Sequence, residues 1–157
     1  MSLNKGFTLI ETMIVIAIIG IMAAVITPNF IVWRNNRIFQ QATRQVYSDI
    51  QKVRNLAIKN NQTITISITG GTGSSGSYTV FLDADNDCIK DSGETVYFSD
   101  SMPADITIGV ASACIKFDFM GFARDGATSY ANSITIGSKT GRSAIISVNI
   151  TGNVRIS

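Results

Sequence analysis

The hydrophobic pattern divides the chain into three stretches. Residues 12–33 carry no charge, and their densest part, Met13 to Ile26, is apolar on every side. Residues 34–60 then place apolar side chains three and four positions apart, which predicts an amphipathic helix. The stripe consists of Phe39, Ala42, Val46, Ile50, Val53 and Leu56 with Ala57. Together the two stretches predict one helix of about 50 residues, about 75 Å long, which ends at Asn60 and Asn61.

The third stretch, from residue 63 onward, has the alternation of β-strands. Residues 63–69 read TITISIT and place three isoleucines on one face. A Gly/Ser-rich segment at residues 70–77 predicts a loop. Further strands are expected at residues 78–82, 95–98, 106–109, 114–119, 133–137, 144–150 and 153–157. The predicted fold class is α+β: a long N-terminal helix, one half transmembrane and one half amphipathic, packed on an antiparallel β-sheet.

The uncharged run is long enough to cross a bilayer, which takes about 20 apolar residues. A signal peptide has an apolar run of about 7–15 residues and then a cleavage site. Here the run continues into the helical pattern, so we expect it to stay on the mature protein. Glu11 stands near its start. A carboxylate in hydrocarbon costs a few kcal/mol, so Glu11 is either paired or wet at the interface. Cleavage after Gly6 would place a new amine on Phe7, one helical turn before Glu11.

The sequence Lys5-Gly6-Phe7-Thr8-Leu9-Ile10-Glu11, followed by an apolar helix and Pro28, resembles the class III signal of type IV pilins and type II secretion pseudopilins. The resemblance implies that prepilin peptidase cuts between Gly6 and Phe7 and methylates Phe7. It also implies that Glu11 pairs with a neighbour's N-terminal amine during assembly, and that Pro28 perturbs the helix. The implied organisation is a leader at 1–6, an assembly helix at 7–33, and a globular domain at 34–157 with helix 34–60 and β-domain 63–157.

The same resemblance implies a location and partners. The chain would cross the bacterial inner membrane once, with a periplasmic domain, and enter a pilus or pseudopilus. Its partners would be other pilin or pseudopilin subunits, prepilin peptidase and inner-membrane lipid. The family places the N-terminus in the cytoplasm, whereas Arg34 and Arg37 just after the span favour the opposite orientation by the positive-inside rule. We give the motif more weight than the charge count.

The last third, KFDFMGFARDGA and then ISVNITGNVRIS, is similar to GspH/FimT-type minor pseudopilins. These are minor components, often proposed to lie near a filament tip. One branch is linked to DNA uptake through basic residues around the final hairpin. The cations available here are Lys139, Arg142 and Arg155, with Asn153 where a second arginine would strengthen the match. The alternative function is therefore a tip-located binding module for DNA uptake or adhesion.

Composition narrows the function classes. The chain has no histidine, which excludes Ser-His-Asp or Cys-His nucleophiles and His-ligated zinc or haem. No nucleophile motif or phosphate loop is present, so no enzyme is expected. The net charge of +2 does not indicate a nucleic-acid binder. Residues 34–59 nevertheless hold six cations and one anion. That basic face is open to three interpretations: a surface near water or anionic lipid, a contact with neighbouring subunits, or nucleic-acid binding.

Two further features lie in the β-domain. EF-hand loops place oxygen ligands at about positions 1, 3, 5, 7, 9 and 12, with glycine at 6. The matching set here is Asp83, Asp85, Asp87, the Ile89 carbonyl, Asp91 and Glu94, with Cys88 in place of the glycine. The loop is interpreted either as a calcium site or as a solvated turn, where Asp and Asn are favoured anyway. Cys88 and Cys114 would form a disulfide in an extracytoplasmic domain; the alternative is two free thiols.

Overall fold

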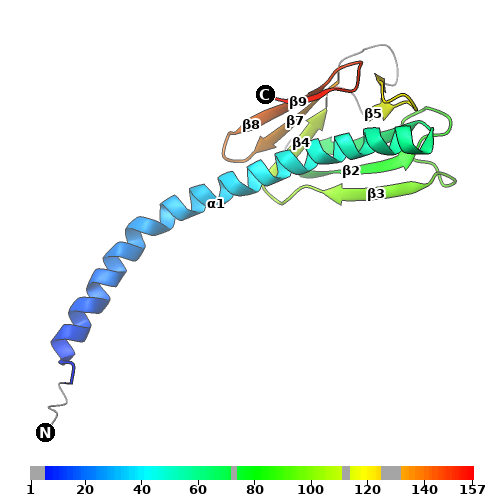
Figure 1. The fold of residues 1–157 in the computed structure, drawn as a ribbon. Coiled ribbons are helices and arrows are strands. Elements are labelled where there is room, and N and C mark those ends of the chain that lie inside the picture. The colour runs from blue at the N-terminus through cyan, green and yellow to red at the C-terminus, as the bar shows by residue number, and fades with distance from the viewer. Residues whose placement is uncertain (1–5, 72–73, 111–113, 125–131) are drawn as a thin grey trace, which may run out of the picture. The chain divides into compact units, whose positions relative to one another are not determined.

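The computed structural model describes residues 6–71, 74–110, 114–124 and 132–157. One long helix precedes nine described strands (Figure 1). The elements are α1 (Leu9–Asn60), β1 (Ile64–Gly71), β2 (Ser74–Leu82), β3 (Val96–Ser101), β4 (Ile106–Val110), β5 (Cys114–Phe117), β6 (Ala123–Arg124), β7 (Asn132–Ser138), β8 (Ser143–Val148) and β9 (Val154–Ile156). The strands form two antiparallel sheets, β3-β2-β1-β5-β6 and β4-β7-β8-β9. The α+β prediction is confirmed, with two sheets where the sequence suggested one.

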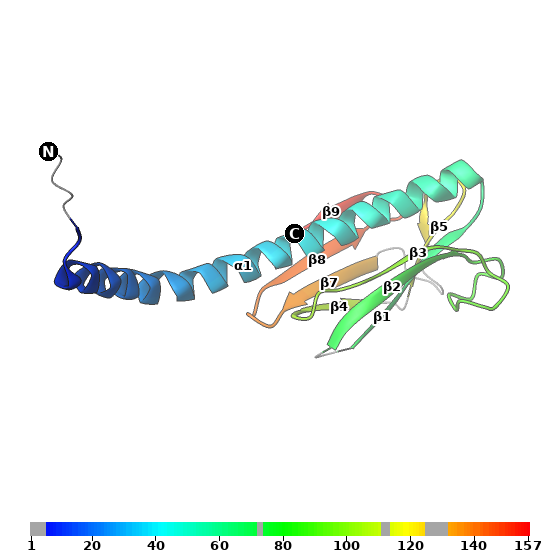
Figure 2. The ribbon, with the colours of Figure 1, turned by 90° about the horizontal axis from the view of Figure 1, so that it is seen from below.

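The chain divides into two compact units, Met1–Arg37 and Ile38–Ser157. The helical part of the second unit lies along one side of its strands (Figure 2). It contributes the predicted apolar stripe to the core, and every stripe residue is buried except the half-buried Leu56. The core also contains Ile64, Ile66 and Ile68 of β1, as the alternation predicted. The hydrophobic core therefore lies within the second unit.

The C-terminal end of α1 is closed by a Schellman motif. Asn61 adopts a left-handed conformation, with φ of 53°. Its N–H donates to the Ile58 carbonyl at 3.3 Å, and the Gln62 N–H donates to the Ala57 carbonyl at 3.2 Å. Asparagine tolerates this conformation better than most residues. The prediction that Asn60 and Asn61 end the helix is confirmed.

Side-chain hydrogen bonds join α1 to the five-stranded sheet, and one of them runs from Asn60 Nδ2 to the Tyr97 hydroxyl on β3 at 2.9 Å. The Tyr78 hydroxyl on β2 donates to Asp49 Oδ2 at 2.5 Å, and Gln45 Nε2 donates to Asp100 Oδ2 on β3 at 2.9 Å. Tyr78 is fully buried. Burial is the main reason that the pKa of its hydroxyl is raised, and the hydrogen bond to Asp49 and the charge of Asp49 raise it further. These contacts fix the direction of the helix across the strands.

The Gly/Ser-rich segment is mostly strand, which corrects the loop predicted at residues 70–77. β1 runs to Gly71 and β2 begins at Ser74. Glycine is required in this hairpin because β4 approaches it closely. A Cβ on Gly70 would lie 2.2 Å from the Ile108 carbonyl oxygen, and one on Gly76 would lie 2.3 Å from Ile108 Cγ2. Glycine here makes room for the second sheet, whereas the sequence alone suggested a turn signal.

The other predicted strands are present with ends shifted by one to three residues. The two-residue β6 was missed, and the strand expected at 114–119 stops at Phe117 because Asp118 begins a tight turn. In that turn Asp118 Oδ1 accepts hydrogen bonds from the N–H groups of Met120 and Phe122 at 3.0 and 2.9 Å.

Candidate assembly segment and acidic loop

The helix begins at Leu9, the third residue after the predicted cleavage point. The Glu11 N–H donates to Thr8 Oγ1 at 3.3 Å, so Thr8 caps the helix. Thr8-Leu9-Ile10-Glu11 has the spacing of a capping box, Ser/Thr-x-x-Glu, in which the glutamate is the third helical residue. Sequence reasoning missed this role of Thr8, although the spacing was readable. The cap places Glu11 in the first turn, where the helix dipole favours a negative charge.

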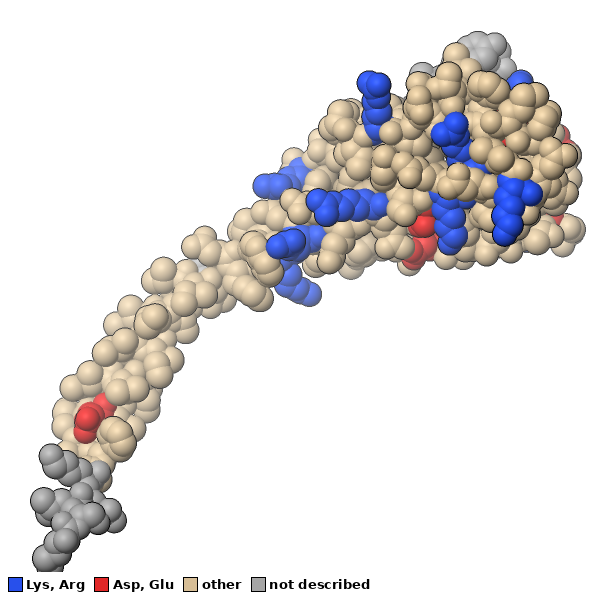
Figure 3. Space-filling model, in the orientation of Figure 1, with Lys and Arg blue, Asp and Glu red and all other residues tan. Residues whose placement is uncertain are grey.

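The first half of α1 is apolar and open to its surroundings. The large apolar side chains from Leu9 to Ile26 are between 49% and 77% exposed. Glu11 is the only charged residue between Phe7 and Trp33, and this segment is drawn almost wholly in tan in Figure 3. By length and composition, α1 could cross a membrane. Such a surface is stable only in lipid or against other apolar surfaces.

Pro28 lies inside α1, which continues through it to Asn60. A proline has no N–H, so the carbonyl of Ala24 loses its usual helical partner. The residue immediately before the proline, Thr27, donates its hydroxyl to the Ala23 carbonyl at 2.7 Å. The helix is thus one hydrogen bond weaker at this point without being broken, and the role of Pro28 in assembly stays a prediction.

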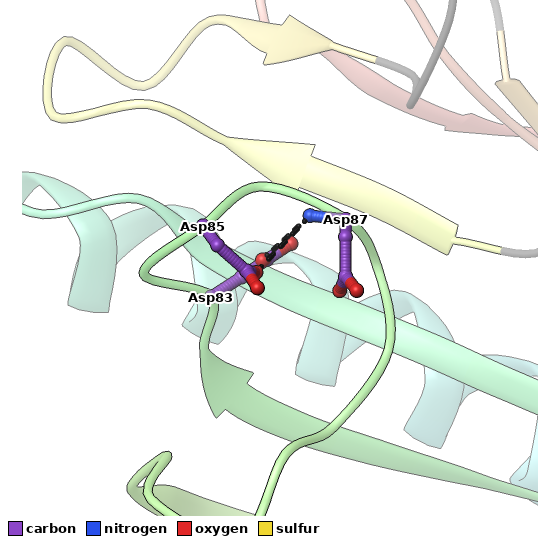
Figure 4. Close-up of side chains that lie close together, drawn as sticks. All are labelled: Asp83, Asp85 and Asp87. Atoms are coloured by element: carbon purple, nitrogen blue, oxygen red, sulfur yellow. Dashed lines mark hydrogen bonds between the residues drawn. The ribbon is translucent and has the colours of Figure 1, made fainter.

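The acidic loop brings three of its six predicted ligands together. Asp83, Asp85 and Asp87 follow β2, and each offers a carboxylate oxygen within 4.8 Å of the others (Figure 4). Glu94 is used differently, since its two oxygens accept the N–H groups of Ala84 and Asp91 at 2.9 and 3.0 Å. Among the described residues, Glu94 and Asp91 are therefore outside the cluster that could hold a metal ion.

The surroundings of Asp85 in this loop disfavour its ionised form. Asp85 has its pKa raised by partial loss of hydration within the loop, and the neighbouring carboxylates of Asp87, Glu94 and Asp91 raise it further. A backbone hydrogen bond with Asp87 acts in the opposite direction. The carboxyl groups on the exposed rim of the loop therefore lie close enough together to disfavour ionisation of Asp85.

Asp83 has a different environment, because it is buried beneath the loop. Its Oδ2 accepts the Thr65 hydroxyl at 2.7 Å and the Cys88 N–H at 3.2 Å, and its Oδ1 accepts the Asp87 N–H at 3.1 Å. The ammonium of Lys116, on β5, lies 3.7 Å from Oδ2. The side chains of Asp83 and Lys116 are 0% and 7% exposed. The first of the predicted calcium ligands is therefore already surrounded by donors.

Cys88 occupies the position where an EF-hand loop has glycine, and it adopts the left-handed conformation with φ of 70°. This conformation is uncommon for a residue with a side chain. Cys88 is held in place by a disulfide to Cys114 on β5, with the Cα atoms 5.9 Å apart. The predicted disulfide is confirmed. Because Cys114 and Lys116 alternate with Ile115 along β5, both reach the loop on the same face of the sheet.

Two of the three cations suggested for DNA, Lys139 and Arg142, lie in the β7–β8 turn, and the third, Arg155, lies on β9. Lys139 lies beyond β7 and pairs with Asp105 at 2.9 Å. Arg142 is exposed in the turn before β8, while Arg155 is exposed on the edge strand β9, opposite Ser147. DNA binding by these residues stays a prediction.

A fourth cation, Arg54 of α1, proves to be structural. Its Nε donates to the Gly121 carbonyl at 3.1 Å and its Nη2 donates to the Thr151 carbonyl at 3.2 Å. Arg54 therefore holds the β5–β6 and β8–β9 turns against the helix. Its place among the basic residues of the sequence gave no sign of this, because both partners are distant carbonyls.

Comparison with known proteins covers both ends of the chain. The family model described as type II transport protein GspH matches residues 42–152, and the prokaryotic N-terminal methylation motif matches residues 1–27. The type IV major pilin protein PilA of Myxococcus xanthus (strain DK1622) is 75% identical over 28 residues, which are 18% of this chain and 13% of PilA. The type IV major fimbrial protein FimA of Dichelobacter nodosus is 47% identical over 53 residues, 34% of this chain and 31% of FimA. The chain thus matches less than a third of the length of these relatives.

The fold has solved counterparts. Two crystal structures of the type IV minor pilin FimU of Pseudomonas aeruginosa (strain PAO1) superpose with a TM-score of 0.57 in each case. The first superposition covers 75% of this chain and 91% of FimU, with 12% sequence identity. The second covers 78% of this chain and 90% of FimU, with 14% sequence identity. At this identity the likeness concerns the fold. Since the GspH model matches more than half of the chain and the methylation motif precedes it, this chain belongs to the GspH family of type IV pilins and pseudopilins.

Proposed function

We propose that this chain is a minor subunit of a type IV pilus or a type II secretion filament. In this proposal prepilin peptidase removes residues 1–6 in the inner membrane, Phe7 is methylated, and the subunit enters the filament through its apolar helix. The observation that carries the proposal is the exposed apolar first half of α1 with one carboxylate, Glu11, in its first turn. An exposed surface of this kind is what packing between subunit helices requires.

The single carboxylate supports the pairing step. No charged residue lies between Glu11 and Arg34, and the helical rise from one to the other is about 35 Å at 1.5 Å per residue. Removal of residues 1–6 also removes Lys5. The nearest cation for Glu11 is then the N-terminal amine of Phe7, on its own chain or on a neighbour. In apolar surroundings an unpaired carboxylate costs a few kcal/mol, so pairing with a neighbour's amine favours the assembled state.

A pair of variants tests the assembly step. Glu11→Gln removes the charge while keeping the size, and we expect the amount of this subunit in sheared filaments to fall at least about tenfold, the effect of about 1.4 kcal/mol. Met13→Leu changes a neighbouring apolar residue with no change in charge and should assemble like the wild type. Normal incorporation of Glu11→Gln would contradict the pairing.

The processing step has a separate test. Intact-mass measurement of the membrane-extracted mature protein should give a chain that begins at N-methylated Phe7. A replacement of Gly6 by a bulky residue should leave residues 1–6 attached. Mature, assembled protein that still carries residues 1–6 would overturn the proposal. Isolation of the filament that contains the subunit, either an extracellular pilus or the secretion apparatus, assigns it to one of the two machines.

A further inference from the structure

A lysine from the sheet reaches into the acidic loop at the place where a metal ion would be expected. Lys116 is on β5 opposite Thr65 of β1. Its ammonium lies 3.7 Å from Asp83 Oδ2 and also contacts the carbonyl oxygen of Asn86. Thr65 donates to the same Asp83 oxygen. One side-chain carboxylate and one main-chain carbonyl of the loop therefore face a single buried positive charge.

The buried ammonium of Lys116 is compensated by partners in the acidic loop. Lys116 is almost fully buried on β5, whose four residues are all buried. A buried ammonium is destabilising unless a negative partner and hydrogen-bond acceptors surround it. Asp83 and the Asn86 carbonyl supply these, and the Cys88–Cys114 disulfide holds the loop on the same face of β5. The loop and the lysine thus satisfy each other.

The loop lacks other features of a complete calcium site. Calcium takes six to eight oxygen ligands. Glu94, the expected bidentate ligand, caps two backbone N–H groups of the loop. Asp83 accepts three hydrogen bonds and contacts Lys116, which leaves little of its coordination capacity. A divalent cation beside Asp83 would also be repelled by the ammonium.

We propose that the Lys116 ammonium is the resident cation of this loop, so that the loop is ordered without a metal ion, and that removal of the ammonium uncovers a latent divalent-cation site formed by Asp83, Asp85 and Asp87. The side chain does the work of a bound ion: it neutralises Asp83 and binds the main chain of the loop at Asn86. Unlike an ion, it cannot dissociate, so the loop keeps its order when the external calcium concentration changes.

The test compares the full chain in detergent micelles with two lysine variants, using calcium chloride and EDTA as probes. The wild type should bind no calcium in equilibrium dialysis up to about millimolar concentration, the range of weak extracellular sites, and its thermal midpoint should be the same in calcium and in EDTA. Lys116→Met should lower the midpoint by about 10 °C, because one partner of a buried ion pair is lost. Calcium should restore part of that loss and bind to the variant.

Lys90→Met is the matched control, since Lys90 is the exposed lysine of the same loop. It should leave the midpoint and the absence of calcium binding unchanged. Calcium binding by the wild type with a rise in midpoint would overturn the proposal, and so would a Lys116→Met variant as stable as the wild type in EDTA. If Lys116→Met folds in calcium but not in EDTA, the proposal is supported. If it folds in neither, the wild-type protein decides: calcium binding with a raised thermal midpoint overturns the proposal, and their absence supports it.

Discussion

At the scale of single residues, Tyr78 shows how burial changes side-chain chemistry. Its ring is part of the core and its hydroxyl donates to Asp49 at the helix–sheet contact. Loss of hydration, followed by the hydrogen bond to Asp49 and the charge of Asp49, raises the pKa of Tyr78 well above its usual value of about 10. The folded protein therefore holds this proton more tightly than the unfolded chain does.

This difference predicts a loss of stability in alkali. Between the unfolded pKa near 10 and the higher folded pKa, the unfolded chain releases a proton that the folded protein keeps, so the free energy of unfolding falls as pH rises, by up to about 1.4 kcal/mol per pH unit. Urea unfolding at about pH 8 and about pH 11 measures the fall. Tyr78→Phe should reduce it. An equally steep fall in Tyr78→Phe would show that other groups cause it.

Asp49→Asn separates the two contributions to this effect. It removes the charge that disfavours ionised Tyr78 but leaves the ring buried. Since burial is the larger cause, the alkaline loss of stability should shrink in Asp49→Asn without disappearing. Complete loss of the pH dependence in this variant would mean that the charge of Asp49, and not burial, controls Tyr78.

At the scale of elements, two glycine turns are locked together by Arg54. Gly121 and Gly152 both have positive φ, at 80° and 75°. A Cβ on Gly152 would lie 2.1 Å from the Gly121 carbonyl oxygen, the same oxygen that accepts from Arg54. The β5–β6 and β8–β9 turns can therefore meet under the helix only if residue 152 has no side chain.

Gly152→Ala should destabilise the domain by about 3 kcal/mol, because a left-handed conformation costs a residue with Cβ about 1–2 kcal/mol and the clash with backbone adds to it. Gly141→Ala is the control. Gly141 has φ of 80° but no atom within 4 Å of its missing Cβ, so only the conformational cost of about 1–2 kcal/mol remains. Chemical denaturation of both variants gives the two values. Equal losses would show that the contact with Gly121 is relaxed elsewhere.

Local pattern predicted the elements better than it predicted their contacts. The stripe from Phe39 to Ala57 and the alternation of Ile64, Ile66 and Ile68 follow from periodicity alone, and they are buried as expected. Gly70 and Gly76 resemble loop residues in sequence because their requirement comes from Ile108, more than 30 residues away. The same holds for Asp83, whose partners Thr65 and Lys116 lie on other strands. Spacing within the loop suggested ligands but could not reveal these partners.

At the scale of the whole molecule, the hydrophobic core and the assembly segment belong to different parts of the chain. Every core residue comes after Ile38, while the apolar side chains from Leu9 to Ile26 are exposed. A fragment of residues 34–157 should therefore be soluble and unfold cooperatively, with a thermal midpoint within about 3 °C of the full chain in detergent, a difference of about 1 kcal/mol. Calorimetry and light scattering check this. An unfolded or aggregated fragment would show that the core needs the preceding helix.

Val46→Asp in the same fragment provides the complementary measurement. Val46 is fully buried in the core, and an unpaired carboxylate there costs several kcal/mol. The variant should not fold, which would show that the fragment depends on this core and not on residual structure of the isolated helix.

The exposed apolar side chains at the start of α1 also restrict the surroundings in which the protein is stable. Each Å² of apolar surface exposed to water costs about 25 cal/mol. Exposure of the isoleucine and valine side chains of this helix to water is therefore strongly unfavourable. In the proposed function, the helix would pass directly from the bilayer into the filament, so that its apolar surface would leave lipid only to contact other apolar helices. In the proposed function, the subunit would therefore join the filament where the bilayer and the filament meet, which is the base of the filament.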